Sequence, residues 1–338
     1  MNISIIIPVY NVELYIERCL DSIMNQTFTD GVECIIVNDC SPDKSLEIAQ
    51  HLINQYKGNI LFRIISHDKN QGVAAARNTG LKAAQGEYII QIDSDDYCEP
   101  NMLEEMYKKA CENESDIVVT DFWEQYTNEA KYISQDCTKF FSPTERIKAI
   151  ITGQLGGYSW NKLIKRNLFT KHNLSYLEGH NFQEDYLMTI KLFYYTSNIT
   201  YIPKAYVHYC QINPNSYLHF ISKASLQDIL FNQEYLTSFL QENGIYSELR
   251  NNISLIKAAN FQHLIFRSKG KLQKEWYLKC KKGINLNDIL HNTHPGLTFY
   301  WKTAAIFALY NMLPVYNLMR FLYRLLLPNK AKSAPLYT

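Results

Sequence analysis

The sequence predicts an α/β fold, with a mostly parallel central sheet flanked by helices and a helical region at the C-terminal end. Three observations predict this fold. Short apolar runs alternate with segments of helical period along the first hundred residues. Several of these runs are almost continuously apolar, which is typical of strands covered on both faces. From about residue 216 onward, helical spacing dominates.

The first half of this pattern begins with a strand at Ile3–Val9. Apolar residues at helical spacing predict a helix within 11–26, and Cys34–Val37 is expected to be the second strand. Ser41-Pro42-Asp43 then combines a hydroxyl cap, a proline at the first helical position and an acid in the first turn. We therefore expect the second helix to begin there.

The second half of the pattern repeats the same alternation. A third strand is expected at 61–65, an alanine-rich helix over 72–84, and a fourth strand at 87–92. Strands that alternate with helices in this way pair in parallel. The C-terminal ends of these strands should therefore lie along one edge of the sheet.

Acidic residues stand at two of these strand ends. Asp93, Asp95 and Asp96 follow the fourth strand, and Asp39 follows the second. Carboxylates so close together repel one another unless a cation lies between them, and oxygen ligands suit Mg²⁺ or Mn²⁺. Open α/β sheets bind ligands at this edge. The alternative is a solvated acidic turn that caps the helix starting near Pro100.

Other readings of the acidic segment fail on the residues present. A calcium loop counted from Asp93 needs glycine where Cys98 stands, and Pro100 interrupts it. The first strand is not followed by the glycine fingerprint of dinucleotide-binding folds, and the chain contains no P-loop lysine motif. Tyr10 could offer an aromatic face to a base. Arg77 could bind a phosphate, or could form a salt bridge to one of the aspartates.

The overall composition excludes some classes of function. With 34 Lys and Arg against 33 Asp and Glu, the chain has no basic field to attract nucleic acid. No signal peptide is visible at the N-terminus. The cysteines form no C-x-x-C pair, which favours free thiols in a reducing, cytoplasmic compartment. They are Cys19, Cys34, Cys40, Cys98, Cys111, Cys137, Cys210 and Cys280.

An ordered set of short segments resembles the glycosyltransferase family 2 enzymes, which have a GT-A-type, Rossmann-like fold. The segments span residues 3 to about 215. They are Ser4-Ile-Ile-Ile-Pro-Val-Tyr-Asn11, Cys19-Leu-Asp-Ser-Ile-Met-Asn-Gln-Thr27, Ile36-Val-Asn-Asp39, Ser41-Pro-Asp43, Asn70-Gln-Gly-Val-Ala-Ala-Ala-Arg-Asn-Thr-Gly80, Gly86-Glu-Tyr-Ile-Ile-Gln-Ile-Asp-Ser-Asp-Asp96, Trp160-Asn-Lys-Leu163 and Glu184-Asp185.

The resemblance implies an inverting, metal-dependent hexosyltransferase that uses a nucleotide-diphosphate sugar, most often a UDP-sugar. It implies a catalytic domain over 1–215, with a nucleotide-sugar-binding half (1–120) and an acceptor half (121–215). The expected nucleotide-binding residues are Pro8, Tyr10, Asp39, Arg77 and Asp93.

The same resemblance assigns the reacting groups. Asp95 is expected to bind Mg²⁺ or Mn²⁺, and Asp185 to act as general base, although acids are also favoured at the start of the helix expected over 184–195. Trp160, Asn161 and Glu184 are the expected acceptor contacts, with core packing as the alternative for Trp160. A sugar nucleotidyltransferase and a catalytically silent binding partner remain the alternative functions.

Two positions depart from the family pattern. Cys40 stands where many members carry glycine after the aspartate that corresponds to Asp39. No arginine stands near Cys210, which puts a contact with the diphosphate in doubt. His208 could bind a phosphate or a metal, although a single histidine on a tyrosine-rich strand is more often structural.

The C-terminal region 216–338 has no catalytic pattern, but its tail, about 298–327, is amphipathic. Leu318, Leu322 and Leu325 share one helical face, and Arg320 and Arg324 lie on the other. We expect this helix to lie in a membrane interface with its basic side toward anionic head groups. The enzyme would then be peripheral on the inner face of the cell membrane, acting on a glycan or a polyprenyl-linked glycan. The alternative is a helix docked on protein.

Overall fold

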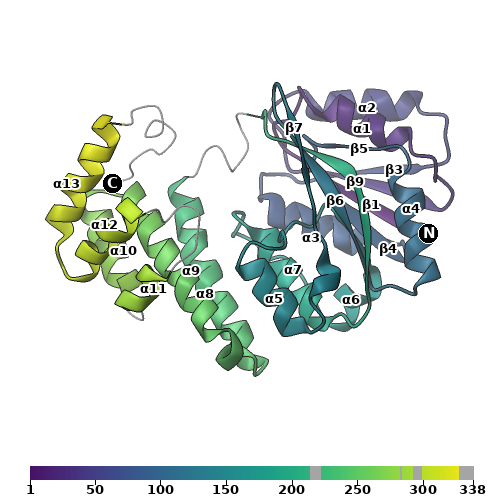
Figure 1. The fold of residues 1–338 in the computed structure, drawn as a ribbon. Coiled ribbons are helices and arrows are strands. Elements are labelled where there is room, and N and C mark those ends of the chain that lie inside the picture. Colours follow the sequence, from purple (N-terminus) through teal and green to yellow (C-terminus); the bar gives the residue numbers. More distant parts are fainter. Residues whose placement is uncertain (214–221, 282–283, 292–298, 327–338) are drawn as a thin grey trace. The chain divides into compact units, whose positions relative to one another are not determined.

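The computed structural model describes residues 1–213, 222–281, 284–291 and 299–326 (Figure 1). The chain forms two compact units, Met1–Pro214 and Asn215–Thr338. The first unit contains the sheet, and the described part of the second is almost entirely helical.

The core of the sheet consists of four parallel strands in the spatial order β3-β2-β1-β4. Their bounds are β1 Ile3–Val9, β2 Val32–Asn38, β3 Leu61–Ser66 and β4 Tyr88–Gln91. All residues of β1 and β2 are buried, as the continuous apolar runs predict. The connecting helices are α1 Ile16–Met24, α2 Ser45–Gln55 and α3 Val73–Ala83. The predicted alternation is therefore confirmed.

The sheet continues beyond β4 with strands that run in both directions, so the whole sheet is mixed. The path continues β4-β8-β6-β9-β5, with β7 paired to β6. Only β6 and β9 are parallel in this part. The added strands are β5 Tyr97–Cys98, β6 Ile117–Gln125, β7 Ala130–Ile133, β8 Lys162–Lys165 and β9 Ile199–Cys210.

Helices cover both faces of this sheet. The side chains of α1, α2 and α4 (Met102–Glu112) form one core with β1, β2 and β4. On the other face α3 lies so close to β1 that a Cβ on Gly80 would be 2.3 Å from Ile6 Cγ2. The remaining helices of this unit are η1 Cys137–Lys139, α5 Pro143–Ile151, α6 Arg166–Lys171 and α7 Glu184–Tyr195.

The second helix begins later than predicted. Its first residue is Ser45. The N-cap residue is Lys44, not Ser41, and its side chain makes no capping hydrogen bond. Asp43 instead accepts hydrogen bonds from the Ser41 hydroxyl (2.6 Å) and from the Ser45 amide (3.1 Å). The Ser-Pro-Asp sequence therefore forms a turn that leads into the helix.

The described part of the second unit contains six helices. They are α8 Lys223–Glu242, α9 Tyr246–Arg267, α10 Gly270–Lys281, α11 Leu286–Leu290, α12 Phe299–Leu309 and α13 Leu313–Leu326. None of the helices in the described ranges is both long and apolar enough to cross a bilayer. All eight cysteines are free thiols, as expected.

The orientation predicted for the tail helix is wrong in one respect. Arg320 is 7% exposed, and its guanidinium donates to the backbone carbonyls of Ile265 (3.0 Å), Phe266 (3.2 Å) and Ser268. These carbonyls lie at the C-terminal end of α9, where no intrahelical donors remain. Arg320 therefore faces the inside of its own unit and is not available to lipid head groups.

Candidate active site

The acidic strand ends lie at one edge of the sheet. Val9 pairs with Asn38, and the Asp39 amide donates to the Val9 carbonyl (3.0 Å). On the other side of β1, the Ile92 amide donates to the Ile6 carbonyl (3.0 Å), so Asp93 also follows the C-terminal end of its strand. The parallel register thus brings residues more than fifty positions apart in sequence to the same edge.

Asp39 is buried, with 2% of its surface exposed, and its carboxylate makes hydrogen bonds within the protein. Its carboxylate accepts hydrogen bonds from the amides of Gln71 (2.9 Å) and Gly72 (2.7 Å), and His67 Nδ1 lies 2.7 Å from Oδ1. Gly72 has φ +89°, and a Cβ there would meet Asn181, so this turn requires glycine. Asp39 thus fixes the turn that precedes α3.

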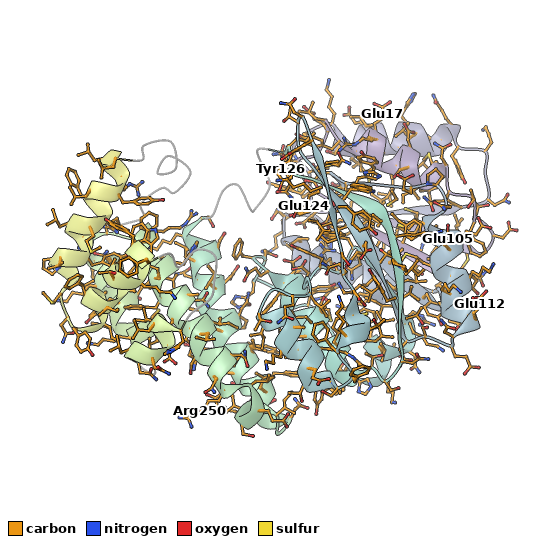
Figure 2. All side chains as sticks on the ribbon, in the orientation of Figure 1. Glu17, Glu105, Glu112, Glu124, Tyr126 and Arg250 are labelled. Atoms are coloured by element: carbon orange, nitrogen blue, oxygen red, sulfur yellow. The ribbon has the colours of Figure 1, made fainter. Side chains whose placement is uncertain are left out.

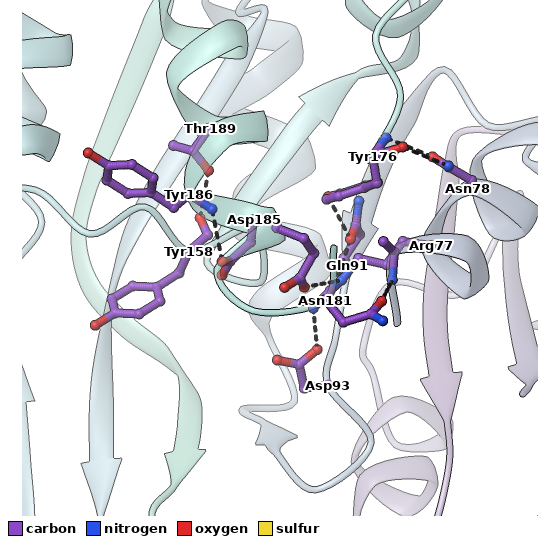
Figure 3. A network of polar contacts seen from close by, with 12 residues as sticks. Arg77, Asn78, Gln91, Asp93, Tyr158, Tyr176, Asn181, Asp185, Tyr186 and Thr189 are labelled. Carbon is purple, nitrogen blue, oxygen red and sulfur yellow. Dashed lines mark hydrogen bonds and ion pairs between the residues drawn. The ribbon is translucent and has the colours of Figure 1, made fainter. Parts of the chain in front are cut away.

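Arg77, on α3, is the centre of a buried ion-pair network (Figure 3). Its guanidinium lies 2.7 Å from Asp93 Oδ1 and 3.2 Å from Glu184 Oε1, and donates to Gln91 Oε1 (2.6 Å). Burial disfavours the charged form, but the two carboxylates outweigh it and raise the pKa of Arg77. Of the two expected roles for Arg77, the salt bridge is present.

Glu184 and Asp185 begin helix α7. Burial and then the charge of Asp185 raise the pKa of Glu184, and Arg77 opposes this shift. Burial likewise raises the pKa of Asp185. The positive charge of Arg77 opposes this shift, and the negative charge of Asp93 adds to it. Asp185 Oδ1 accepts a hydrogen bond from the Tyr186 amide (2.8 Å). Glu184 is bound to Arg77, whereas no cation lies within salt-bridge distance of Asp185 in the described residues.

Asp95 and Asp96 add two carboxylates beside Asp93. The pKa of Asp95 is raised by burial and by the charge of Asp93. That of Asp96 is raised further, by burial and by both neighbouring aspartates. Asp96 Oδ1 accepts a hydrogen bond from the Cys210 amide (2.7 Å), but its other oxygen is buried without a partner in the described structure. Crowded carboxylates of this kind repel one another, and a cation bound between them would relieve that repulsion.

Arg18 is a residue of this edge that the sequence did not single out. It reaches from α1 and donates to the Asp95 backbone carbonyl (2.9 Å) and to Cys210 Sγ (3.0 Å). Its guanidinium also lies 4.6 Å from the centre of the Tyr97 ring. A guanidinium therefore lies beside Cys210 although no arginine stands near Cys210 in sequence. No spacing rule connects residue 18 with residue 210.

His208 has a structural setting. Its Nε2 lies 2.8 Å from Glu99 Oε1 and its Nδ1 lies 2.7 Å from Gln125 Nε2. Its ring is stacked on Tyr97 with 4.3 Å between centroids. Across the described ranges, no group of three His, Cys, Asp or Glu side chains forms a metal-binding cluster.

Trp160 and Asn161, the expected acceptor contacts, are both buried in this structure. Trp160 is 1% exposed and packs edge-on against Phe122 (4.7 Å), and Asn161 is fully buried and donates to the Thr120 carbonyl (2.7 Å). The more open ring of this loop is that of Tyr158, stacked on Trp160 at 4.8 Å. Burial and then the charge of Asp185 raise the pKa of Tyr158 to about 12. Tyr158 therefore lies within electrostatic reach of Asp185.

Lys162 holds the loop that carries Tyr158. Its buried ammonium donates to the carbonyls of Tyr158 (2.5 Å) and Gly156 (3.3 Å) and to Asn161 Oδ1 (2.8 Å). Burial lowers the pKa of Lys162, and the charge of Asp185 opposes this shift only in part, so that the pKa is about 7. The Thr189 hydroxyl of α7 donates to the Gly157 carbonyl (2.9 Å) and lies 3.4 Å from the Tyr158 carbonyl. Thr189 and Tyr158 are seen together in Figure 3. Glu124, near the end of β6 (Figure 2), also acts electrostatically on Tyr158.

Comparison with known proteins identifies the family. Residues 4–172 match the model of glycosyl transferase family 2. The chain is 36% identical to EpsH of Bacillus subtilis over 256 residues, which cover 74% of this chain and 72% of EpsH. The chain belongs to glycosyl transferase family 2.

One further relative and one solved structure are also similar to this chain. Over 124 residues, 35% of the chain and 19% of the relative, it is 45% identical to a poly(ribitol-phosphate) beta-glucosyltransferase of Bacillus spizizenii. The structure of S. aureus TarS in complex with UDP-GlcNAc superposes with a TM-score of 0.69 over 96% of this chain and 92% of that one, at 20% identity. The latter comparison shows the GT-A-like fold. The protein is thus a glycosyltransferase of family 2 with that fold.

The ion-pair network predicts a large effect of removing Arg77. The Arg77→Met variant leaves the carboxylates of Asp93 and Glu184 without their cation, and Glu184 is only 8% exposed. Removing one partner of a buried pair costs about 3–5 kcal/mol of unfolding free energy. Urea denaturation should show this loss.

Two companion variants make the test specific. Adding Glu184→Gln to Arg77→Met should recover part of the loss, because one of the orphaned charges is removed. Lys108→Met, at a side chain that is 70% exposed, should change the unfolding free energy by less than about 0.5 kcal/mol. Equal effects of Arg77→Met and Lys108→Met would contradict this account.

Proposed function

We propose that this glycosyltransferase moves a sugar from a UDP-linked donor to a hydroxyl group of a surface glycan, with inversion at the anomeric carbon. The observation that carries the proposal is the position of Asp185, next to the Arg77-bound Glu184 and within electrostatic reach of Asp93. The names of similar proteins support it. TarS has been solved with UDP-GlcNAc, and one relative is a poly(ribitol-phosphate) beta-glucosyltransferase.

The donor would bind along the acidic edge. Tyr10 is 48% exposed directly after β1 and can stack on a base, and Pro8 stands two residues earlier, within the strand. Asp39 and Arg77 bind neighbouring residues in this structure, so their contact with a nucleotide would replace one of those bonds. Asp93, at 27% exposure, is open enough to reach the ribose.

A divalent cation fits the carboxylates of this edge. Asp93 and Asp95 supply oxygen ligands only, which suits Mg²⁺ or Mn²⁺, and such ions are usually completed by substrate phosphates. When bound, the cation would stabilise the negative charge that develops on the departing diphosphate. The residues that would hold it are Asp93 and Asp95. Binding of the cation would reduce the repulsion between these two carboxylates, which contributes to the raised pKa of Asp95.

Asp185 would act as the general base. The acceptor oxygen attacks the anomeric carbon while the bond to the diphosphate oxygen breaks, and UDP leaves with the electron pair. The proton of the acceptor hydroxyl passes to Asp185. Glu184 is less suited to this task because Arg77 occupies its carboxylate. One displacement without a covalent intermediate gives inversion.

The acceptor would lie against Tyr158. Its ring is partly exposed, and the carbonyl of the same residue is fixed by Lys162. An aromatic face beside polar groups suits the apolar side of a sugar ring. We propose a polyprenyl-linked or polymeric glycan, of the teichoic acid or O-antigen kind, as the acceptor.

The Asp185→Asn variant tests the role of the base. The amide oxygen can still accept the Tyr186 hydrogen bond, so the local structure should remain, but the group no longer takes a proton. We expect turnover to fall about 10²–10⁴-fold. The assay is UDP release with poly(ribitol phosphate) as acceptor probe and a panel of UDP-sugars, while the thermal shift caused by UDP should be unchanged.

The control for this assay is Asp21→Asn, at an exposed position on α1, which should turn over like the wild-type protein. Turnover of Asp185→Asn within threefold of that control would remove Asp185 from its proposed role.

The Asp95→Asn variant tests the cation site. UDP with Mn²⁺ should raise the melting temperature of the wild-type protein more than UDP alone does. The variant loses one anionic ligand, so we expect it to lose most of the Mn²⁺-dependent part. Removal of Mn²⁺ with a chelator should abolish the same part in the wild type. An unchanged Mn²⁺ effect in the variant would show that the cation binds elsewhere or that Asp95 is dispensable.

A further inference from the structure

Helix α13 packs against the rest of its unit with its polar face. Tyr316 is fully buried and Arg320 is 7% exposed. Asn317 and Gln273 exchange two side-chain hydrogen bonds (2.8 and 3.1 Å). Together with the bonds from Arg320 to the end of α9, these contacts fix how the helix is rotated. The opposite face of the helix must therefore point away from the unit's interior.

That outward face is apolar. Leu318, Phe321, Leu322, Leu325 and Leu326 are between 42% and 74% exposed. Their spacing of three and four residues places them on one side of the helix. A helix at the surface of a soluble unit usually has the reverse arrangement. A contiguous exposed apolar surface of this kind indicates a docking site.

The charge distribution of the chain indicates what binds there. Residues 215–338 contain 15 Lys and Arg against 6 Asp and Glu, a formal charge of +9. Residues 1–214 contain 19 against 27, a charge of −8. The two opposite charges nearly cancel, so the net charge of the whole chain is only +1. The positive charge of the second unit indicates that it is attracted to an anionic partner.

The described cations of this unit are spread over several helices. On α10, Lys271, Lys274 and Lys279 are exposed, and Arg250 extends from α9 (Figure 2). A unit that carries both a distributed positive charge and an exposed apolar helix face suits an anionic bilayer. Such a bilayer attracts the whole unit and accepts apolar side chains at the boundary of head groups and acyl chains.

We propose that the second unit binds the surface of an anionic lipid bilayer, with the apolar face of α13 inserted and the helix parallel to the surface. Arg320 takes no part in head-group binding because its guanidinium donates hydrogen bonds to backbone carbonyls at the C-terminal end of α9. The attraction comes instead from the remaining cations of the unit. This proposal does not depend on the reaction assigned to the first unit.

The test is co-sedimentation of the full chain with vesicles. The protein should bind phosphatidylcholine vesicles that contain about a quarter of phosphatidylglycerol, and binding should fall roughly tenfold or more with phosphatidylcholine alone or at about 1 M salt. Leu318→Glu and Leu322→Glu should each weaken binding to the anionic vesicles roughly tenfold, because a charge replaces an inserted leucine.

Leu61→Glu is the matched control. It makes the same change at a leucine of the first unit that is 49% exposed, between Leu322 at 42% and Leu318 at 58%, and should bind vesicles like the wild type. Thermal unfolding of each variant checks that the fold is intact. Three results would overturn the proposal: no binding of the wild type, equal binding of Leu322→Glu and Leu61→Glu, or loss of a dimer in Leu322→Glu without any vesicle binding.

Discussion

The candidate active site depends on one buried guanidinium group, that of Arg77. Arg77 extends from α3 and joins Asp93, at the end of β4, to Glu184, at the start of α7. These three residues come from parts of the chain that are up to 107 positions apart. A buried guanidinium is stable only when such partners are present, and the carboxylates in turn need the guanidinium. The pairing therefore fixes the strand ends and the acidic helix start relative to each other.

This pairing also divides the work among the carboxylates. Glu184 is neutralised by Arg77, which leaves Asp185 as the adjacent acid without a salt bridge among the described residues. Asp95 and Asp96 lie farther along the same turn, and their pKa values are raised by burial and by mutual repulsion. A site with excess negative charge at one point and a compensated pair at another can bind a cation and accept a proton at different places.

Much of this arrangement could be predicted from the sequence because it follows from periodicity. The continuous apolar runs of β1 and β2 predict buried parallel strands, and parallel strands bring Asp39 and Asp93 to one edge. The sequence pattern places the start of α2 too early because the Ser-Pro-Asp turn resembles a helix cap. The later strands could not be ordered, because β8 inserts between β4 and β6 through long-range pairing that no local pattern shows.

Side-chain partnership was the least predictable feature. Trp160 could equally have lined a sugar site or the core, and only the packing against Phe122 decides for the core. Arg18 meets Cys210 across 192 positions, a contact that no spacing rule indicates. In α13, amphipathic spacing is evident from the sequence, but which face is buried depends on the α9 carbonyls that Arg320 binds.

The proposed reaction requires the edge formed by β1, β2 and β4 to hold a nucleotide through a cation on Asp95, beside the Arg77 network. A crystal structure of the full chain with UDP and Mn²⁺ tests it most directly. We expect a single anomalous manganese peak between the Asp95 carboxylate and the diphosphate, with the Arg77–Glu184 pair retained and Asp185 facing the diphosphate. A diphosphate bound away from this edge, or manganese bound without Asp95, would contradict it.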